Sequence, residues 1–205
     1  MRITVVDTGT ANLASMRVAL QRLGAEVILT CEPGEVRAAE SLVLPGVGAF
    51  ATGMARLTEC GLGEPIVDHV NAERPFLAVC LGLQLLCRSS EESPGVRGMG
   101  ALQTDVRRFP DSHAGGRLTV PQLGWNDVTP DPACALLQAG HAYFANSYHL
   151  AAIPDGWTGA ESVHGLPFVA ALERGPMLAC QFHPELSGAW GSALLRRWLE
   201  RHTAC

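Results

Sequence analysis

Short apolar runs alternate with amphipathic stretches throughout the first half of the chain, and this alternation strongly constrains the fold. The runs that have the length and composition of buried strands are residues 3–7, 27–30, 41–44 and 76–79. The spacing of apolar residues predicts helices at about 12–23, 51–57 and 65–70. Strands that are joined through helices pair in parallel, so this order predicts an α/β fold. We expect a flavodoxin-like, mostly parallel central sheet with helices on both faces.

The second half of the chain has a different pattern. Short strand patterns separated by turn residues occur at 102–109, 118–121, 125–128, 141–146 and 168–172, and a final helix is predicted over 187–201. Consecutive strands without an intervening helix pair antiparallel. We therefore expect antiparallel strands to extend the sheet, within a single domain that spans residues 1–205.

Composition argues against several classes of protein. The chain is 47% hydrophobic and 17% charged, with a net charge of -5 and no Lys, which is typical of a globular protein without a basic surface for nucleic acid or membranes. The 7 cysteines are scattered without a CxxC pair, so we expect neither a disulfide framework nor a metal or other cofactor. Neither a signal peptide nor a membrane span is expected, which favours a cytoplasmic location.

Cys80 stands where a predicted strand passes directly into a predicted helix. This junction is typical of the elbow that presents a nucleophile, and it needs small residues two positions away, which Ala78 and Gly82 provide. The positive end of the following helix would stabilise the thiolate, which is the reactive form of Cys. The alternative is a buried Cys that packs as a small hydrophobe.

His183 and Glu185 follow another apolar run, residues 177–182, which is predicted to be a strand. A thiol nucleophile needs a base, and the base needs a group that fixes its orientation. His183 fits the first role and Glu185 the second. Taken alone, His183 could simply end a strand and Glu185 could be a solvated carboxylate. Together with the elbow at Cys80, the pair is better interpreted as catalytic.

The segment PGVGAF, residues 45–50, follows the strand predicted at 41–44. Its two glycines allow the backbone to approach a ligand closely and to turn its N–H groups inward. Such N–H groups stabilise the oxyanion that forms when a carbonyl carbon is attacked. The alternative is an ordinary turn between a strand and a helix.

Several segments together resemble the class I glutamine amidotransferases. VCLGLQLL around Cys80 and QFHPE at residues 181–185 are similar to the motifs of that class. Further segments resemble the glutaminase subunit of imidazole glycerol phosphate synthase, an enzyme of histidine biosynthesis: PGVGAF, PQLGWN at 121–126, YFANSY at 143–148, SSEES at 89–93 and DTGTANLAS at 7–15.

The resemblance implies a reaction and residues that perform it. Cys80 would attack the side-chain amide of glutamine, His183 would transfer the proton, and Glu185 would orient His183. Ammonia would leave, and water would hydrolyse the thioester to glutamate. The backbone N–H groups implied to stabilise the oxyanion belong to Val47, Gly48 and Leu81. The residues that match positions holding glutamine are Gln84, Glu92, Ser147 and Tyr148.

The resemblance also implies a partner. In such a heterodimer the ammonia passes to a cyclase subunit, a (β/α)8 barrel. There it reacts with a phosphoribosyl-formimino-carboxamide nucleotide to give imidazole glycerol phosphate and aminoimidazole carboxamide ribotide. Such glutaminases are nearly inactive until the cyclase binds its nucleotide, and residues 45–48 would couple the two sites. The residues that match the cyclase-facing surface are Asn12, Trp125 and Tyr143, and Leu186 occupies a further position on that surface.

The chain departs from this family at a few positions. Leu186 stands where the family usually has Lys, and Gln122 and Asn146 each replace a usual His. These changes affect the expected interface and its regulation, not Cys80, His183 or Glu185. The alternatives are another class I glutaminase subunit, a catalytically silent regulatory protein on the same fold, or a hydrolase such as a γ-glutamyl peptidase.

Overall fold

The computed structural model describes residues 1–9, 13–113, 115–150 and 152–201. Five parallel strands form one half of its large sheet, in the order β14-β4-β3-β1-β2. They are β1 (Arg2–Val6), β2 (Glu26–Thr30), β3 (Leu42–Leu44), β4 (Phe76–Val79) and β14 (Met177–Cys180). Strands β3, β4 and β14 are buried along their whole length, because helices cover both faces.

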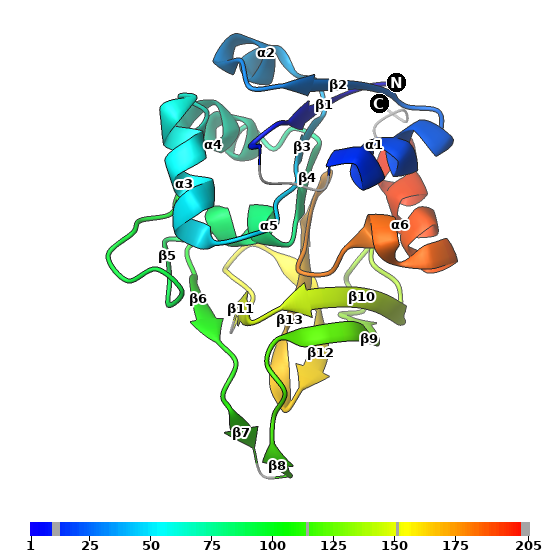
Figure 1. Ribbon diagram of the computed structural model, residues 1–205. Coiled ribbons are helices and arrows are strands. Elements are labelled where there is room, and N and C mark those ends of the chain that lie inside the picture. The colour runs from blue at the N-terminus through cyan, green and yellow to red at the C-terminus, as the bar shows by residue number, and fades with distance from the viewer. Residues whose placement is uncertain (10–12, 114, 151, 202–205) are drawn as a thin grey trace.

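The helices divide between the two faces of this half (Figure 1). They are α1 (Leu13–Arg22), α2 (Pro33–Ala38), α3 (Phe50–Glu59), α4 (Gly63–Asn71), α5 (Leu81–Leu85) and α6 (Gly188–Arg201). Helices α1 and α6 pack on one face with a first hydrophobic cluster, and α2, α3, α4 and α5 pack on the other with a second. Alternate residues of β4 point into the two clusters: Leu77 and Val79 into the first, Phe76 and Ala78 into the second.

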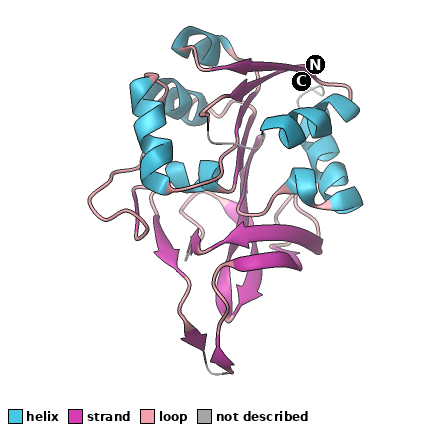
Figure 2. Cartoon of the chain, in the orientation of Figure 1, coloured by secondary structure: helices cyan, strands magenta, loops and turns pink. Residues whose placement is uncertain are grey.

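Antiparallel strands continue the sheet beyond β14, as Figure 2 shows in magenta. Their order is β13 (Leu166–Arg174), β12 (Thr158–His164), β9 (Gln122–Pro130) and β10 (Gly140–Asn146). The shorter elements are β5 (Ser89–Ser90), β6 (Asp105–Arg108), β7 (Ser112–His113), β8 (Gly116–Arg117), β11 (Tyr148–Leu150) and the 3-10 turn η1 (Pro184–Leu186). The predicted combination of a parallel half and added antiparallel strands is confirmed. In the described residues, no helix has both the length and the apolar content to cross a bilayer.

One predicted strand is wrong. Residues 118–121 form no strand, because their backbone is bonded elsewhere: the Leu118 N–H donates to the carbonyl of Asp111, and Pro121 has no N–H to donate. The strand β9 begins only at Gln122. The helix α2 and the strand β12 were not predicted, since neither carries a long apolar pattern, and the short strands β5, β7, β8 and β11 were not predicted either.

The turn from β4 to α5 packs tightly against β3. Cys80 has φ 53°, in the left-handed region that favours glycine. A Cβ atom on Gly82 would collide with the carbonyl oxygen of Leu44. A side chain at this position would therefore push α5 away from β3, and with it the turn that carries Cys80.

We expect Gly82→Ala to lower the free energy of unfolding by about 2 kcal/mol, because the obstructing atom belongs to the backbone and cannot rotate away. Urea denaturation measures this. Gly63→Ala is the matched control, since nothing lies within 4 Å of a Cβ at the first residue of α4. That change should stay within about 0.5 kcal/mol. Equal stability of the two variants would contradict the packing described here.

Candidate active site

Cys80 lies at the carboxyl end of β4, on the sharp turn predicted from the sequence. Its backbone N–H donates to the carbonyl of Cys180 at 2.7 Å, so the turn is anchored to the neighbouring strand β14. In the described residues, Glu73 is the other non-glycine residue with positive φ. Such a backbone costs on the order of 1–3 kcal/mol and persists where the surrounding structure imposes it, often at a functional site.

His183 and Glu185 reach the same edge of the sheet from β14. His183 Nδ1 lies 2.9 Å from Glu185 Oε1, and both side chains are buried. The 3-10 turn η1, with Pro184 at its start, brings the Glu185 carboxylate to the imidazole of His183. The second carboxylate oxygen of Glu185 is buried and has no hydrogen-bond partner among the described residues. Among the described residues, His183 is therefore the hydrogen-bond partner of the Glu185 carboxylate.

The imidazole of His183 also hydrogen-bonds Cys80. Because Nδ1 faces Glu185, Nε2 is the nitrogen that meets the sulfur. Burial lowers the pKa of His183, but the hydrogen bonds and negative charges of Cys80 and Glu185 outweigh this effect, so the pKa rises to about 10. The three side chains thus favour a protonated imidazole held between two acidic groups.

A cavity of about 250 Å³ opens beside Cys80 and His183. The residues predicted to bind glutamine or to stabilise an oxyanion all line it: Val47, Gly48, Leu81, Gln84, Glu92, Ser147 and Tyr148. These residues come from four separate segments of the chain. The structure therefore brings the predicted set together, although their individual roles stay predictions.

The segment 45–50 is held at both ends. The carbonyl of Gly46 accepts the N–H of Leu81 at 3.3 Å, so this predicted oxyanion donor is engaged in the present conformation. At the other end, the carboxylate of Glu92 accepts the N–H of Phe50 at 2.7 Å and caps the first turn of α3. Sequence reasoning missed this capping role, because the two residues are far apart in the chain.

The residues predicted to meet a partner lie near the edge of the antiparallel half. Trp125 on β9 and Tyr143 on β10 are register partners, with ring centroids 6.2 Å apart. Trp125 is 59% exposed and Leu186 40% exposed, and the sequence analysis missed Leu123, which is 70% exposed on the Trp125 side of β9. Asn12 lies outside the described residues.

The main chain of Tyr143 connects this surface to His183, the predicted base. Its carbonyl accepts the N–H of His183 at 2.9 Å, and its own N–H donates to Ser187 Oγ at 2.9 Å. The hydroxyl of Ser187 in turn donates to the carbonyl of His183 at 2.7 Å. The edge strand β10 is therefore bonded to the segment that carries the imidazole.

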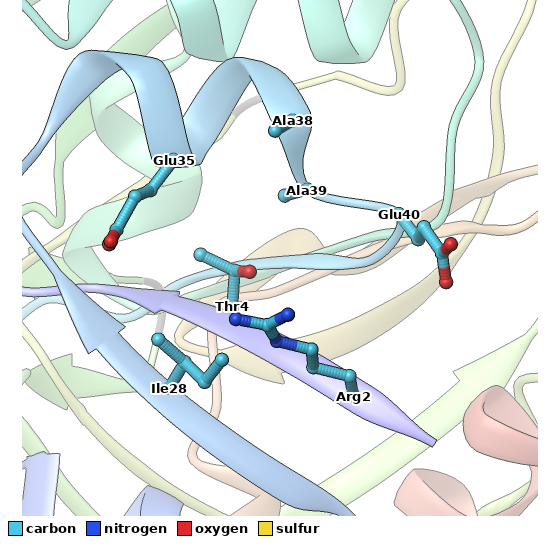
Figure 3. A pocket seen from close by; sticks show the side chains of 7 residues that line it. All are labelled: Arg2, Thr4, Ile28, Glu35, Ala38, Ala39 and Glu40. Atoms are coloured by element: carbon cyan, nitrogen blue, oxygen red, sulfur yellow. The ribbon is translucent and has the colours of Figure 1, made fainter.

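Figure 3 shows another cavity, of about 200 Å³, at the amino end of β1 beside β2 and α2. Its charged side chains are Arg2, Glu35 and Glu40. It contains neither Cys nor His, so it offers no thiol nucleophile or imidazole base. In the described residues, no three His, Cys, Asp or Glu side chains are placed to hold a metal ion.

Comparison with known proteins agrees with this geometry. The model of the family "Glutamine amidotransferase class-I" matches residues 4–201. The imidazole glycerol phosphate synthase subunit HisH of Thermus thermophilus is 41% identical over 203 residues, which cover 98% of this chain and 99% of the relative. The chain belongs to the class I glutamine amidotransferases, in the HisH group. The family predicted from the sequence, and with it the class of enzyme, is confirmed.

A second relative of this amidotransferase is longer. The imidazole glycerol phosphate synthase hisHF of Arabidopsis thaliana, described as chloroplastic, is 40% identical over 204 residues, and the match spans 96% of this chain but only 34% of the relative. Among solved structures, a glutamine amidotransferase superposes with a TM-score of 0.76 at 22% identity and covers 98% of this chain and 99% of its own. That likeness shows the fold alone.

We expect Glu185→Gln to lower the pKa of His183 in the amidotransferase by about one unit or more, because the imidazolium loses an adjacent negative charge. Nitrogen NMR of the imidazole across a pH series measures this. Since the folded pKa of about 10 lies above the ordinary 6.5, the protonated ring contributes stability that is present below pH 6.5 and lost as the pH rises toward 10. Glu161→Gln, at an exposed site on β12, should leave the titration unchanged.

Proposed function

We propose that Cys80, His183 and Glu185 are the catalytic residues of a glutaminase. The Cys80 sulfur attacks the amide carbon of glutamine, and the imidazolium of His183 protonates the leaving nitrogen, so that ammonia departs and a γ-glutamyl thioester remains. His183 then takes a proton from water, which attacks the thioester to release glutamate and regenerate the thiolate. The observation that carries this proposal is the buried Cys80–His183–Glu185 chain on a strained turn beside a cavity.

The oxyanion donors in this proposal are the backbone N–H groups of Leu81 and of residues 47–48. Because the N–H of Leu81 is bonded to Gly46, it has to be released before it can stabilise an oxyanion. We infer that residues 45–48 shift when the enzyme is activated. This inference supports the expectation of a glutaminase that is nearly inactive in isolation.

The partner that we propose is the cyclase subunit of imidazole glycerol phosphate synthase, a (β/α)8 barrel that receives the ammonia. One relative is named a subunit of that synthase, and the longer hisHF relative bears the name of the whole synthase. The exposed surface around Trp125, Tyr143 and Leu186 suits such a partner, because large apolar side chains at the centre of an interface supply much of its affinity. The proposed heterodimer acts in the cytoplasm, in histidine biosynthesis, with one amidotransferase domain over residues 1–205.

We expect the purified chain to hydrolyse glutamine slowly alone, and to show a large rise in turnover when the cyclase and its nucleotide are both added. Glutamate release measures this. Cys80→Ala should lower kcat by at least about a thousandfold, because it removes the nucleophile. Cys31→Ala, at an exposed Cys, is the matched control and should leave the rate unchanged.

Other outcomes would favour the alternatives. No glutamate release in the presence of the cyclase and its nucleotide would indicate a silent regulatory protein. Full turnover without the cyclase would contradict activation by a partner and would favour an independent hydrolase. Failure to bind the cyclase would favour another class I glutaminase subunit.

We expect Trp125→Ala to raise the dissociation constant of the complex with the cyclase by about tenfold to a hundredfold, because the large exposed ring is suited to anchor the interface. Isothermal titration calorimetry measures this. Leu29→Ala is the control, since Leu29 is 37% exposed on β2, the opposite edge strand of the sheet. Equal affinities for the two variants would exclude Trp125 from the interface.

A further inference from the structure

Gln181 places a buried amide directly beside the proposed nucleophile. The residue follows β14, is fully buried, and is fixed by a backbone hydrogen bond from its N–H to the carbonyl of Ala170 at 2.8 Å. Its side-chain Nε2 donates to the sulfur of Cys80 at 3.8 Å. Burial of an amide without partners costs free energy, so the contacts of this side chain determine its position.

Gln84 determines which end of the Gln181 amide faces the sulfur. Gln84 Nε2 donates to Gln181 Oε1 at 3.0 Å and to the carbonyl of Tyr148 at 3.1 Å, so both of its N–H groups are used. A Gln181 side chain turned by 180° would place two donor nitrogens against each other. The oxygen of Gln181 therefore faces Gln84, and its N–H group faces Cys80.

An N–H group that is aimed at sulfur distinguishes the two forms of the thiol. Sulfur in a neutral thiol is a weak acceptor, whereas a thiolate is charged and accepts a stronger, charge-assisted hydrogen bond. A hydrogen bond to the charged form favours that form. Gln181 thus acts on Cys80 together with His183, as a second donor on the same sulfur.

The same contacts restrict how Gln84 can bind a ligand. Since both of its N–H groups are engaged, the group that Gln84 can offer to the cavity is its carbonyl oxygen, which accepts a hydrogen bond. Glutamine carries N–H donors at its amide and at its ammonium group. A ligand N–H group that donates to the Gln84 oxygen would polarise the Gln84 amide and strengthen the hydrogen bond from Gln84 to Gln181.

We propose that Gln181 is a positioning residue of the active site, whose side-chain amide, oriented by Gln84, donates a hydrogen bond to Cys80 and favours its thiolate. This inference rests on the proposed role of Cys80 as the nucleophile. The proposed role of Gln181 differs from a packing role, because a side chain that only filled space would not affect how the reactivity of Cys80 depends on pH.

The test is the rate at which iodoacetamide alkylates Cys80 across a pH series, followed by mass spectrometry of the peptide that contains Cys80. In Gln181→Met we expect the pH midpoint of alkylation to rise by about one unit, with about tenfold slower alkylation below the midpoint. Gln103→Met is the matched control, because the exposed amide of Gln103 donates to the backbone carbonyl of Gly100. Its midpoint should equal that of the unsubstituted chain.

Gln181→Glu provides a second variant of nearly the same size, which keeps the packing. The carboxylate still accepts from Gln84 but cannot donate to sulfur, and its negative charge also disfavours the thiolate, so the midpoint should rise by more than in Gln181→Met. With the cyclase and its nucleotide, kcat for glutamine hydrolysis should fall about tenfold at neutral pH while KM changes little, and kcat should recover as the pH is raised.

Unchanged midpoints in the folded Gln181 variants would overturn the inference, whereas loss of activity in Cys80→Ala would still support the proposed function. Retained activity in Cys80→Ala would overturn the proposed function itself. If Gln181→Met fails to unfold cooperatively, Gln84→Met decides, because it adds no charge beside the sulfur. Gln84→Met frees the Gln181 amide to turn, and it should raise the midpoint in the same direction.

Discussion

The parallel pairing of β4 with β14 is the interaction on which the rest of the site depends. Val79 lies opposite Cys180 in the ladder, and the N–H of Cys80 continues the ladder to the carbonyl of Cys180. Parallel strands end at the same edge of a sheet, which is where open α/β sheets bind their ligands. This pairing brings Cys80 and His183 together although they are far apart in the sequence, and the helices on both faces exclude water from the strands beneath them.

Burial makes each polar contact around Cys80 more influential than it would be in water, because the local dielectric constant is low. His183 is held by Glu185 from one side, while Gln84 and Gln181 form a chain of amides from Tyr148 to the sulfur. The segment 45–50 is in turn held by Leu81 and Glu92. The proposed nucleophile is therefore tightly constrained, whereas the segment that would stabilise an oxyanion is engaged in its own hydrogen bonds.

The sequence predicted those features that depend on local pattern. The buried strands β1 and β4 and the elbow at Cys80 follow from apolar runs and small neighbours, and the family motifs identified His183 and Glu185. The strand expected at residues 118–121 was wrong, because apolar character there does not reveal where the backbone hydrogen bonds go. The amide of Gln181 and the cap from Glu92 were missed for a related reason. Both depend on side chains that meet only in the folded chain, and neither residue type indicates its partner.

The hydrogen bonds of Tyr143 to His183 and Ser187 involve its main chain, not its phenol ring. A main-chain bond persists whichever side chain is attached, so it tolerates sequence drift in a way that a side-chain ion pair does not. An exposed residue near β10, such as Leu186, can then diverge to suit a particular partner, while the imidazole remains hydrogen-bonded to the same strand. Co-evolution of two subunits could in this way remodel the proposed interface without disturbing the geometry of Cys80, His183 and Glu185.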